Sequence, residues 1–139
     1  MPMPMELQRA SQEFEAYLAD TRETTGLTTR NQIYTTTQGV LHSFRRRLDL
    51  DEAIRFAGVL PPILRAIFVA DWDTSEPKSA FGERADWTKD AQALRKDHNF
   101  SSDTCVRDVA AALRKHVDKK EFERTLATLP EAAKDFWRA

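Results

Sequence analysis

The chain has 139 residues, and its 21 Lys and Arg side chains nearly balance 22 Asp and Glu, for a formal net charge of −1. A chain of this length buries enough surface for one sizeable core, so it needs neither disulfides nor a structural metal. Proteins that hold nucleic acid or acidic lipid usually carry a positive excess, which neither half of this chain has. Composition therefore argues against a nucleic-acid partner and predicts a single domain spanning 1–139.

The start of the chain and its apolar runs bear on localisation. Residues 1–6 lack the basic and apolar regions of a signal peptide, and no run approaches the roughly 18 apolar residues of a membrane span. The single cysteine, Cys105, cannot form an internal disulfide, which fits a reducing compartment. We expect a cytoplasmic protein with no membrane contact.

Apolar residues recur at helical spacing almost throughout, and the chain has only four glycines, which together predict an all-α fold. The first helix has its apolar stripe over 7–18 and ends before Gly26, because glycine takes a left-handed cap conformation at low cost. The second helix has its stripe over 33–48. It opens at Thr28 or Thr29, since either hydroxyl is able to cap it.

A capping box and a pair of prolines mark the next two helices. Asp49 stands three residues before Glu52, the spacing at which each side chain satisfies a free backbone N–H at a helix start. The third helix therefore opens there and runs to Leu60. Pro61 or Pro62 then starts the fourth helix, because proline suits the first helical turn.

Beyond the fourth helix the composition changes, and 71–86 is rich in charged and turn-forming residues. The pairs Asp71-Trp72 and Asp86-Trp87 bracket this connector. Two indoles at its ends predict a loop packed against the body of the protein, not a free linker. Helical patterns then resume in the same order as before, over 87–94, 106–117, 122–129 and 133–137.

The second half of the chain repeats the pattern of the first. An offset of 69 in the numbering aligns 35–68 with 104–137 without a gap. The alignment matches Val40 with Val109, the Asp49/Glu52 box with Asp118/Glu121, and Leu60-Pro61 with Leu129-Pro130. It predicts a helical bundle of two tandem four-helix repeats related by a pseudo-twofold axis, with repeat one at about 5–70, the connector at about 71–86 and repeat two at about 87–138. The second helix of repeat one is expected to be longer than its counterpart.

Several short motifs occur together along the chain: Phe14-Glu-Ala-Tyr17-Leu18, Thr25-Gly26-Leu27, Gly39-Val40-Leu41, Arg47-Leu48, Glu52-Ala53, and Leu60-Pro61 to Leu64-Arg65. In this order they resemble the bacterial domain-of-unknown-function 2267 family, and the resemblance covers nearly the whole chain. The second half departs from the pattern, since Ala133 matches Leu64 and Asp108 matches Gly39. The resemblance implies a helical, duplicated chain without a settled activity, and it supplies no catalytic residues.

Candidate catalytic and metal-binding residues are few. No two of His42, His98 and His116 stand three or four residues apart, and no cysteine pair exists, so the spacings of common zinc sites are missing. His42 lies about 150° from the apolar stripe of its helix, which predicts a solvent-exposed side chain. Cys105 falls in the middle of a predicted helix, opposite Thr36 in the alignment, and we expect a small half-buried filler. The sequence thus predicts no catalytic residue, no metal and no cofactor.

Basic residues gather where the second helix of each repeat ends: Arg45, Arg46 and Arg47 in the first, Arg114 and Lys115 in the second, at the same offset of 69. At about 100° per residue, Arg45 and Arg47 flank the buried stripe and Arg46 points outward. One interpretation is structural, because cations at a helix C-terminus complement the helix dipole. The other is a pair of basic patches that bind an anionic partner. These five side chains are the candidate binding residues.

Three functional hypotheses follow. The first is a non-enzymatic helical module that acts through its surface, by binding an unknown protein partner or by self-association, since two similar repeats provide two similar surfaces. The alternative is anion or nucleic-acid binding through the basic helix ends. The third is an enzyme whose site forms between the two repeats, which a search for local motifs would not detect.

Overall fold

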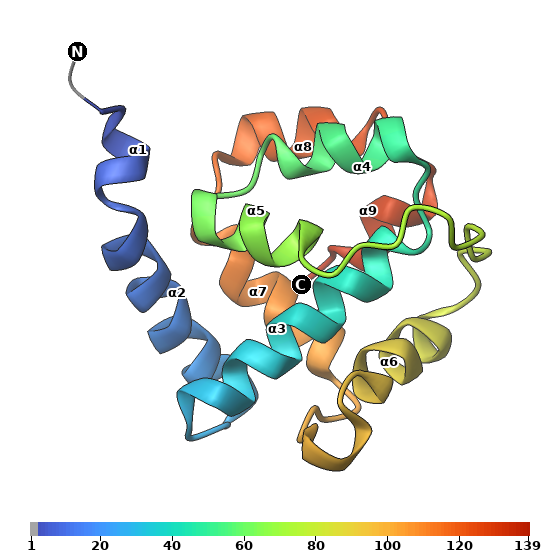
Figure 1. Cartoon of the computed structure of the whole chain (residues 1–139), viewed down its shortest axis with the longest axis horizontal. Helices are drawn as coiled ribbons and strands as arrows, with labels where there is room; N and C mark the ends of the chain where they lie inside the picture. The colour runs from blue at the N-terminus through green and yellow to red at the C-terminus, as the bar shows by residue number, and fades with distance from the viewer. Residues whose placement is uncertain (1–2) are drawn as a thin grey trace.

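The computed structural model describes residues 3–139, and within these residues the chain is all-α, as predicted, with no strand (Figure 1). The first half contains α1 (Met5–Gln8), α2 (Ala10–Thr25), α3 (Arg30–Arg45), α4 (Leu50–Ala57) and α5 (Pro62–Val69). The second half contains α6 (Arg84–Ala93), the 3-10 helix η1 (Lys96–His98), α7 (Cys105–Arg114), α8 (Lys119–Leu126) and α9 (Ala132–Phe136). None of these helices is long and apolar enough to cross a membrane.

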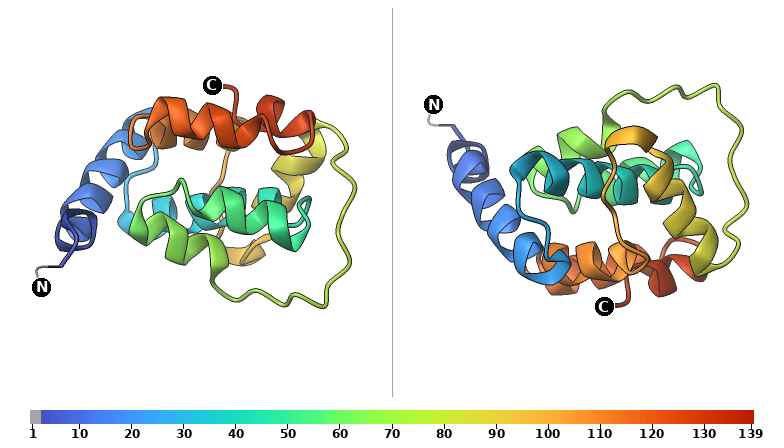
Figure 2. Two further views of the ribbon diagram at one scale, coloured as in Figure 1. Left: turned by 90° about the horizontal axis from the view of Figure 1, so that it is seen from above. Right: turned by 90° about the horizontal axis from the view of Figure 1, so that it is seen from below.

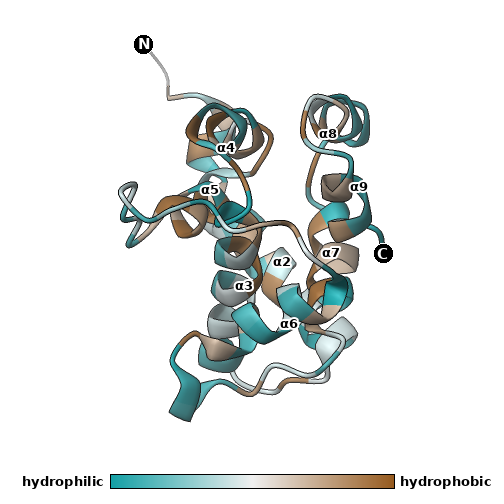
Figure 3. Ribbon diagram, turned by 90° about the vertical axis from the view of Figure 1, so that its right-hand side faces the viewer, coloured by the Kyte–Doolittle hydropathy of each residue, from teal (hydrophilic) through white to brown (hydrophobic). Residues whose placement is uncertain are grey.

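Helix α3 lies at the centre of the fold. It packs along α6 and also contacts α2, α5 and α7. Seen from the side, α3, α4 and α5 lie opposite α7, α8 and α9 (Figure 3). Phe44 and Phe56 of the first set meet Phe136 and Phe122 of the second, with ring centroids 4.8 and 5.9 Å apart. One aromatic core therefore joins the two sets of helices.

The N-terminal helix and the connector lie at the periphery. Helix α1 leads away from the body, and its side chains are exposed (Figure 1). The connector between α5 and α6 runs along the outside (Figure 2). The Ser79 N–H donates to the Arg46 carbonyl at 2.8 Å, and Trp87 Nε1 donates to the Phe81 carbonyl at 2.6 Å. These hydrogen bonds hold the connector to α3 and α6.

Local signals place several helix ends of the first half where the sequence predicts them. Helix α2 ends at Gly26, which is left-handed with φ 75°. Thr29 caps α3, because its hydroxyl accepts the Gln32 N–H at 3.1 Å and Gln32 returns a bond to the Thr29 N–H. Helix α5 begins at Pro62, the second of the two prolines.

The two capping aspartates give a stability prediction. Asp49 Oδ1 accepts the Glu52 N–H at 3.0 Å, and Asp118 Oδ1 accepts the Glu121 N–H at the same distance. We expect Asp49→Ala and Asp118→Ala each to lower the free energy of unfolding by about 0.5–2 kcal/mol, because each leaves an N–H at a helix start without its partner. Urea unfolding measures the loss. Unchanged midpoints in both variants would show that the caps do not stabilise α4 and α8.

Helix boundaries recur along the chain at the predicted offset of 69. Helix α4 covers 50–57 and α8 covers 119–126, so both of their ends match at this offset. Helices α3 and α7 end at Arg45 and Arg114, which match in the same way. Helix α3 has 16 residues and α7 has 10, which confirms the longer helix expected in the first half.

Two predicted placements are wrong. Helix α6 begins at Arg84, inside the predicted connector, because Glu83 and Asp86 form a capping box in which Asp86 Oδ2 accepts the Glu83 N–H at 2.9 Å. Cys105 is the first residue of α7 and not a mid-helix residue, since the preceding turn closes through a bond from its N–H to the Ser102 carbonyl at 3.2 Å. The Cys105 side chain is fully buried, and burial raises its pKa to about 11. The thiol therefore stays protonated and fills space.

Candidate binding pockets at the basic helix ends

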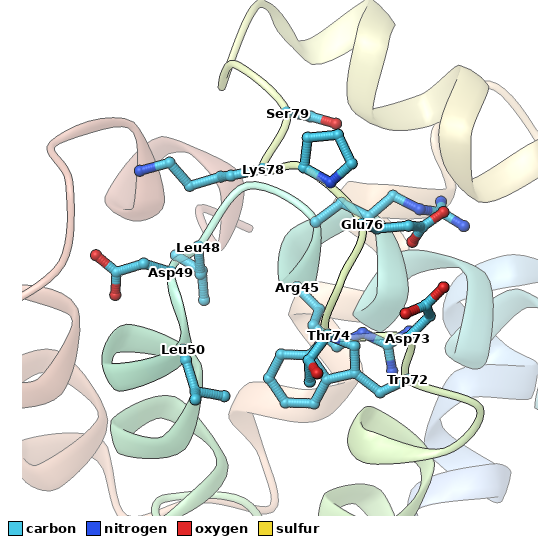
Figure 4. Close-up of a pocket in the computed structure, with 12 residues that line it drawn as sticks. Arg45, Leu48, Asp49, Leu50, Trp72, Asp73, Thr74, Glu76, Lys78 and Ser79 are labelled. Carbon is cyan, nitrogen blue, oxygen red and sulfur yellow. The ribbon is translucent and has the colours of Figure 1, made fainter.

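The guanidinium of Arg45 is held between the end of α5 and the first indole of the connector. Its Nη1 donates to the Phe68 carbonyl at 2.8 Å and to the Ala70 carbonyl at 2.9 Å. Its Cζ lies 5.1 Å from the centroid of the Trp72 ring, within range of a cation–π contact (Figure 4). The residue is only 5% exposed, and burial lowers the pKa of its guanidinium.

Arg45 lines a pocket of about 360 Å³ at the junction of α3, α4 and the connector (Figure 4). The pocket is lined by Arg45, Arg46, Leu48, Asp49, Leu50, Trp72, Asp73, Thr74, Glu76, Pro77, Lys78 and Ser79. We call it the connector pocket. The connector forms one wall, and α3 with the start of α4 forms the other.

The connector pocket contains three cations and three acids, yet none of them are paired with one another. Within residues 3–139, no carboxylate lies within 4 Å of a charged nitrogen of Arg45, Arg46 or Lys78. Two of the acids are used in local turns: Asp49 caps α4, and Asp73 Oδ1 accepts from the Ser75 hydroxyl at 2.6 Å. Arg45 is therefore a buried cation without a carboxylate partner among the described residues.

The basic end of α7 is built differently. Arg114 Nε donates to the Trp137 carbonyl at 2.6 Å, and Trp137 is the counterpart, at the offset of 69, of Phe68, the residue that Arg45 binds. Arg114 Nη1 also donates to Glu123 Oε1 at 2.5 Å, which forms an ion pair. The counterpart of Glu123 in the first half is Ile54. The two arginines thus bind corresponding carbonyls, but only Arg114 has a carboxylate.

A second pocket forms at this end of α7, lined by Arg114, Lys115, Val117, Lys119, Phe122 and Glu123. We call it the α8 pocket. At the offset of 69, its residues Arg114, Lys115, Val117 and Lys119 correspond to Arg45, Arg46, Leu48 and Leu50 of the connector pocket. Lys115 is exposed and Arg46 is half-buried. Four of the five predicted binding residues therefore lie in two pockets at corresponding positions.

Arg47, the fifth predicted residue, lines neither of these pockets. Its Nη1 donates to Asp90 Oδ2 at 2.7 Å and to the Ser43 carbonyl at 2.8 Å, while its Nε donates to the Phe81 carbonyl at 3.0 Å. These partners belong to α6, α3 and the connector. Arg47 therefore holds α6 and the connector against α3. Because its side chain has this structural role, Arg47 is not part of the candidate site.

His42 is buried, so the prediction of a solvent-exposed side chain is wrong. Its Nε2 lies 2.9 Å from the Ile67 carbonyl, and because a carbonyl only accepts, Nε2 carries the proton. Helical periodicity failed here because α5 covers the face of α3 that lies opposite its apolar stripe. In the part of the chain that the structure describes, no group of three or more His, Cys, Asp or Glu side chains is placed to hold a metal ion.

Helical periodicity does not predict the exposure of two apolar side chains of α4, one lining the connector pocket and one a turn further along. Leu50 is 51% exposed and Ile54 is 59% exposed, one turn apart on α4. The alignment at offset 69 could have indicated that these positions face solvent, because it pairs Leu50 with Lys119 and Ile54 with Glu123. The corresponding positions on α8 are thus charged, as expected for a solvated helix face.

These features define an all-α protein with a pocket at the basic end of each of two corresponding helices. The family described as "Uncharacterized conserved protein (DUF2267)" matches residues 14–136, and the chain belongs to this family. The match confirms the resemblance drawn from the sequence motifs. No curated protein matches the chain. Because the family is uncharacterised, its function has to be argued from the pockets and the surface.

Proposed function

We propose that the chain is a non-enzymatic, cytoplasmic module of two tandem helical repeats, related by a pseudo-twofold axis, that binds a segment of another protein. The recurrence of α3, α4 and α5 as α7, α8 and α9 at an offset of 69 supports the repeat. The corresponding bonds from Arg45 to Phe68 and from Arg114 to Trp137 support it as well. Repeat one is the half that contacts the partner.

The exposed apolar side chains of α4 carry this proposal. Leu50 and Ile54 are more than half exposed, and Val69 at the end of α5 is exposed too. Their counterparts at offset 69 are Lys119, Glu123 and Arg138. At these three positions the second half of the chain has charged side chains, so its fold does not need apolar residues there. The apolar side chains of repeat one are therefore better explained by a contact than by folding.

The connector pocket lies beside this apolar face, because Leu50 belongs to both. A partner segment that covers Leu50 and Ile54 would therefore reach the cations of the pocket. Three exposed apolar side chains form a small patch for a stable dimer of this chain, which favours a short segment of another protein as the occupant. The interior between the repeats holds the aromatic cluster of Phe44, Phe56 and Phe122, so we do not place a catalytic site there.

The test is the double variant Leu50→Gln/Ile54→Gln, which removes apolar surface without changing charge. We expect a partner captured from the native host and then purified to bind this variant at least about tenfold more weakly, because two buried aliphatic side chains contribute a few kcal/mol to binding. The variant should unfold at the wild-type urea midpoint, since both side chains are exposed in the free protein.

Lys119→Gln, which alters the α8 position that corresponds to Leu50 and keeps the Arg114–Glu123 ion pair, is the matched control and should bind as the wild type does. Equal binding by all three proteins would overturn the proposal. Sedimentation equilibrium tests whether the occupant is a second copy of the chain. If the wild type forms a dimer and the Leu50/Ile54 variant does not, the partner is a second copy.

A further inference from the structure

We infer that the connector pocket, which Arg46 also lines, binds a carboxylate of the partner segment, an Asp or Glu side chain with apolar neighbours, through Arg45. The identity of the partner as a protein segment rests on the proposed function. The carboxylate site itself rests on independent observations at Arg45, which concern its burial, its missing acid and its counterpart in the second repeat.

The second repeat displays the interaction that Arg45 lacks. Arg114 binds the Trp137 carbonyl and a carboxylate, that of Glu123, while Arg45 binds the Phe68 carbonyl and has apolar Ile54 at the position of the acid. A guanidinium has five N–H donors. Among the described residues, Nε and Nη2 of Arg45 have no acceptor, so three N–H groups remain for an incoming anion.

The setting of Arg45 suits a planar, singly charged anion. Trp72 packs on the guanidinium, whose planar geometry presents the parallel N–H groups that a carboxylate binds. Leu48 and Leu50 line the same pocket and offer apolar contact to the groups next to the carboxylate. Arg45 as a whole is only 5% exposed, which reduces competition from water for its free N–H groups.

The acids on the rim favour a carboxylate over a phosphate. Asp49, Asp73 and Glu76 line the pocket with the three cations, so the pocket has no net positive excess. A doubly charged phosphate costs more to remove from water than a carboxylate does, and a pocket without net positive charge does not offset that cost. The volume of about 360 Å³ is near the lower end for small-molecule sites, which fits one or two side chains of a peptide.

The experiment titrates ¹⁵N-labelled full-length protein with the blocked tripeptide acetyl-Leu-Glu-Leu-amide and with its Gln counterpart. We expect the Glu peptide to shift the Arg45 Nε–H resonance saturably, with a Kd in the millimolar range, and to bind at least about tenfold tighter than the Gln peptide. Inorganic phosphate and 3-phenylpropionate are titrated in parallel.

Ile54→Glu is the decisive variant, because it places an acid where Glu123 stands in the second repeat. Ile54 is exposed, so neither this change nor its neutral control Ile54→Gln threatens folding. We expect Ile54→Glu to weaken binding of the Glu peptide at least about tenfold more than Ile54→Gln does, because only Glu supplies a competing carboxylate. Glu123→Gln should free Arg114, so that the peptide then shifts the Arg114 Nε–H resonance as well. Arg45→Gln is less suitable, because it removes the bonds to Phe68 and Ala70.

Three results would overturn the inference: equal binding of the two tripeptides, equal loss in Ile54→Glu and Ile54→Gln, or shifts centred away from Arg45. Tighter binding of phosphate would overturn the choice of a carboxylate. Tighter binding of 3-phenylpropionate than of the Glu peptide would overturn the choice of a protein segment. Because no natural partner enters this titration, its failure is distinguishable from failure of the Leu50/Ile54 test.

Discussion

Gly39→Ala is expected to lower the free energy of unfolding by about 1–3 kcal/mol, because the backbone of α6 lies in close contact with α3 at this residue. A Cβ at position 39 would lie 2.5 Å from the Ala91 carbonyl oxygen and 3.2 Å from its carbonyl carbon. These are backbone atoms of α6, so no side chain can rotate away. One turn along α3, the Ser43 hydroxyl donates to the Trp87 carbonyl at 2.9 Å and holds the two helices at this separation. Overpacking of this kind typically costs about 1–3 kcal/mol and sometimes more.

Gly58→Ala is the matched control for this prediction. Gly58 ends α4 with φ −63°, and the nearest atom to an added Cβ is the Arg55 carbonyl oxygen of its own turn at 3.3 Å. Alanine is favoured over glycine by about 1 kcal/mol in a helix interior, as at position 39, and by less at a helix end, as at position 58, but only Gly39→Ala adds the clash. Urea unfolding should separate them. If the two variants unfold at the same midpoint, α3 and α6 are not packed as closely as we describe.

Several helix ends were predictable because their causes are local. The caps at Gly26, Thr29 and Asp49 depend on residues within one turn, and periodicity found the apolar stripes in between. The need for glycine at 39 comes from Ala91, which is far along the chain. No local sequence pattern indicates that two helices approach this closely, so the requirement for glycine at position 39 could not be predicted from the sequence.

The candidate site was predictable in part for the same reason. Arg45 and Arg114 stand out in the sequence as the basic ends of corresponding helices. What distinguishes them is contributed by distant residues: Trp72 and the carbonyl of Phe68 for Arg45, and Glu123 for Arg114. Helical periodicity places a side chain relative to its own helix only, and cannot tell a salt-bridged arginine from a buried one without an acid.

His42 is a second side chain that helical periodicity misplaces: it is predicted to be in solvent, but it is 3% exposed and packs against α5. Its burial affects the pH dependence of stability. Burial is the main cause that lowers its pKa from 6.5 to about 4, and the charges of Arg45 and Arg46 lower it further. The bond to the Ile67 carbonyl and the charge of Asp71 act in the opposite direction. The folded protein therefore keeps His42 neutral at pH values where the unfolded chain binds a proton.

The sign of the pH dependence follows from these two pKa values. Above pH 6.5 both states hold a neutral His42, and its contribution to stability is complete. Between pH 6.5 and about 4 the unfolded state binds more protons, so the free energy of unfolding falls as the pH falls. One pKa unit corresponds to about 1.4 kcal/mol, which gives a loss of about 2–3 kcal/mol from His42 by pH 4.5.

Comparison with His42→Gln isolates this loss from that of the carboxylates, which also titrate on acidification. The Gln amide is able to donate to the Ile67 carbonyl but does not ionise. Urea unfolding of both proteins between pH 7.5 and 4.5 should show the wild type losing about 2–3 kcal/mol more than the variant, whatever their difference at pH 7.5. Parallel curves would mean that His42 charges as readily in the folded state as in the unfolded chain. That result would contradict a buried, neutral imidazole bonded to Ile67, because a protonated ring at this position would have to reach solvent.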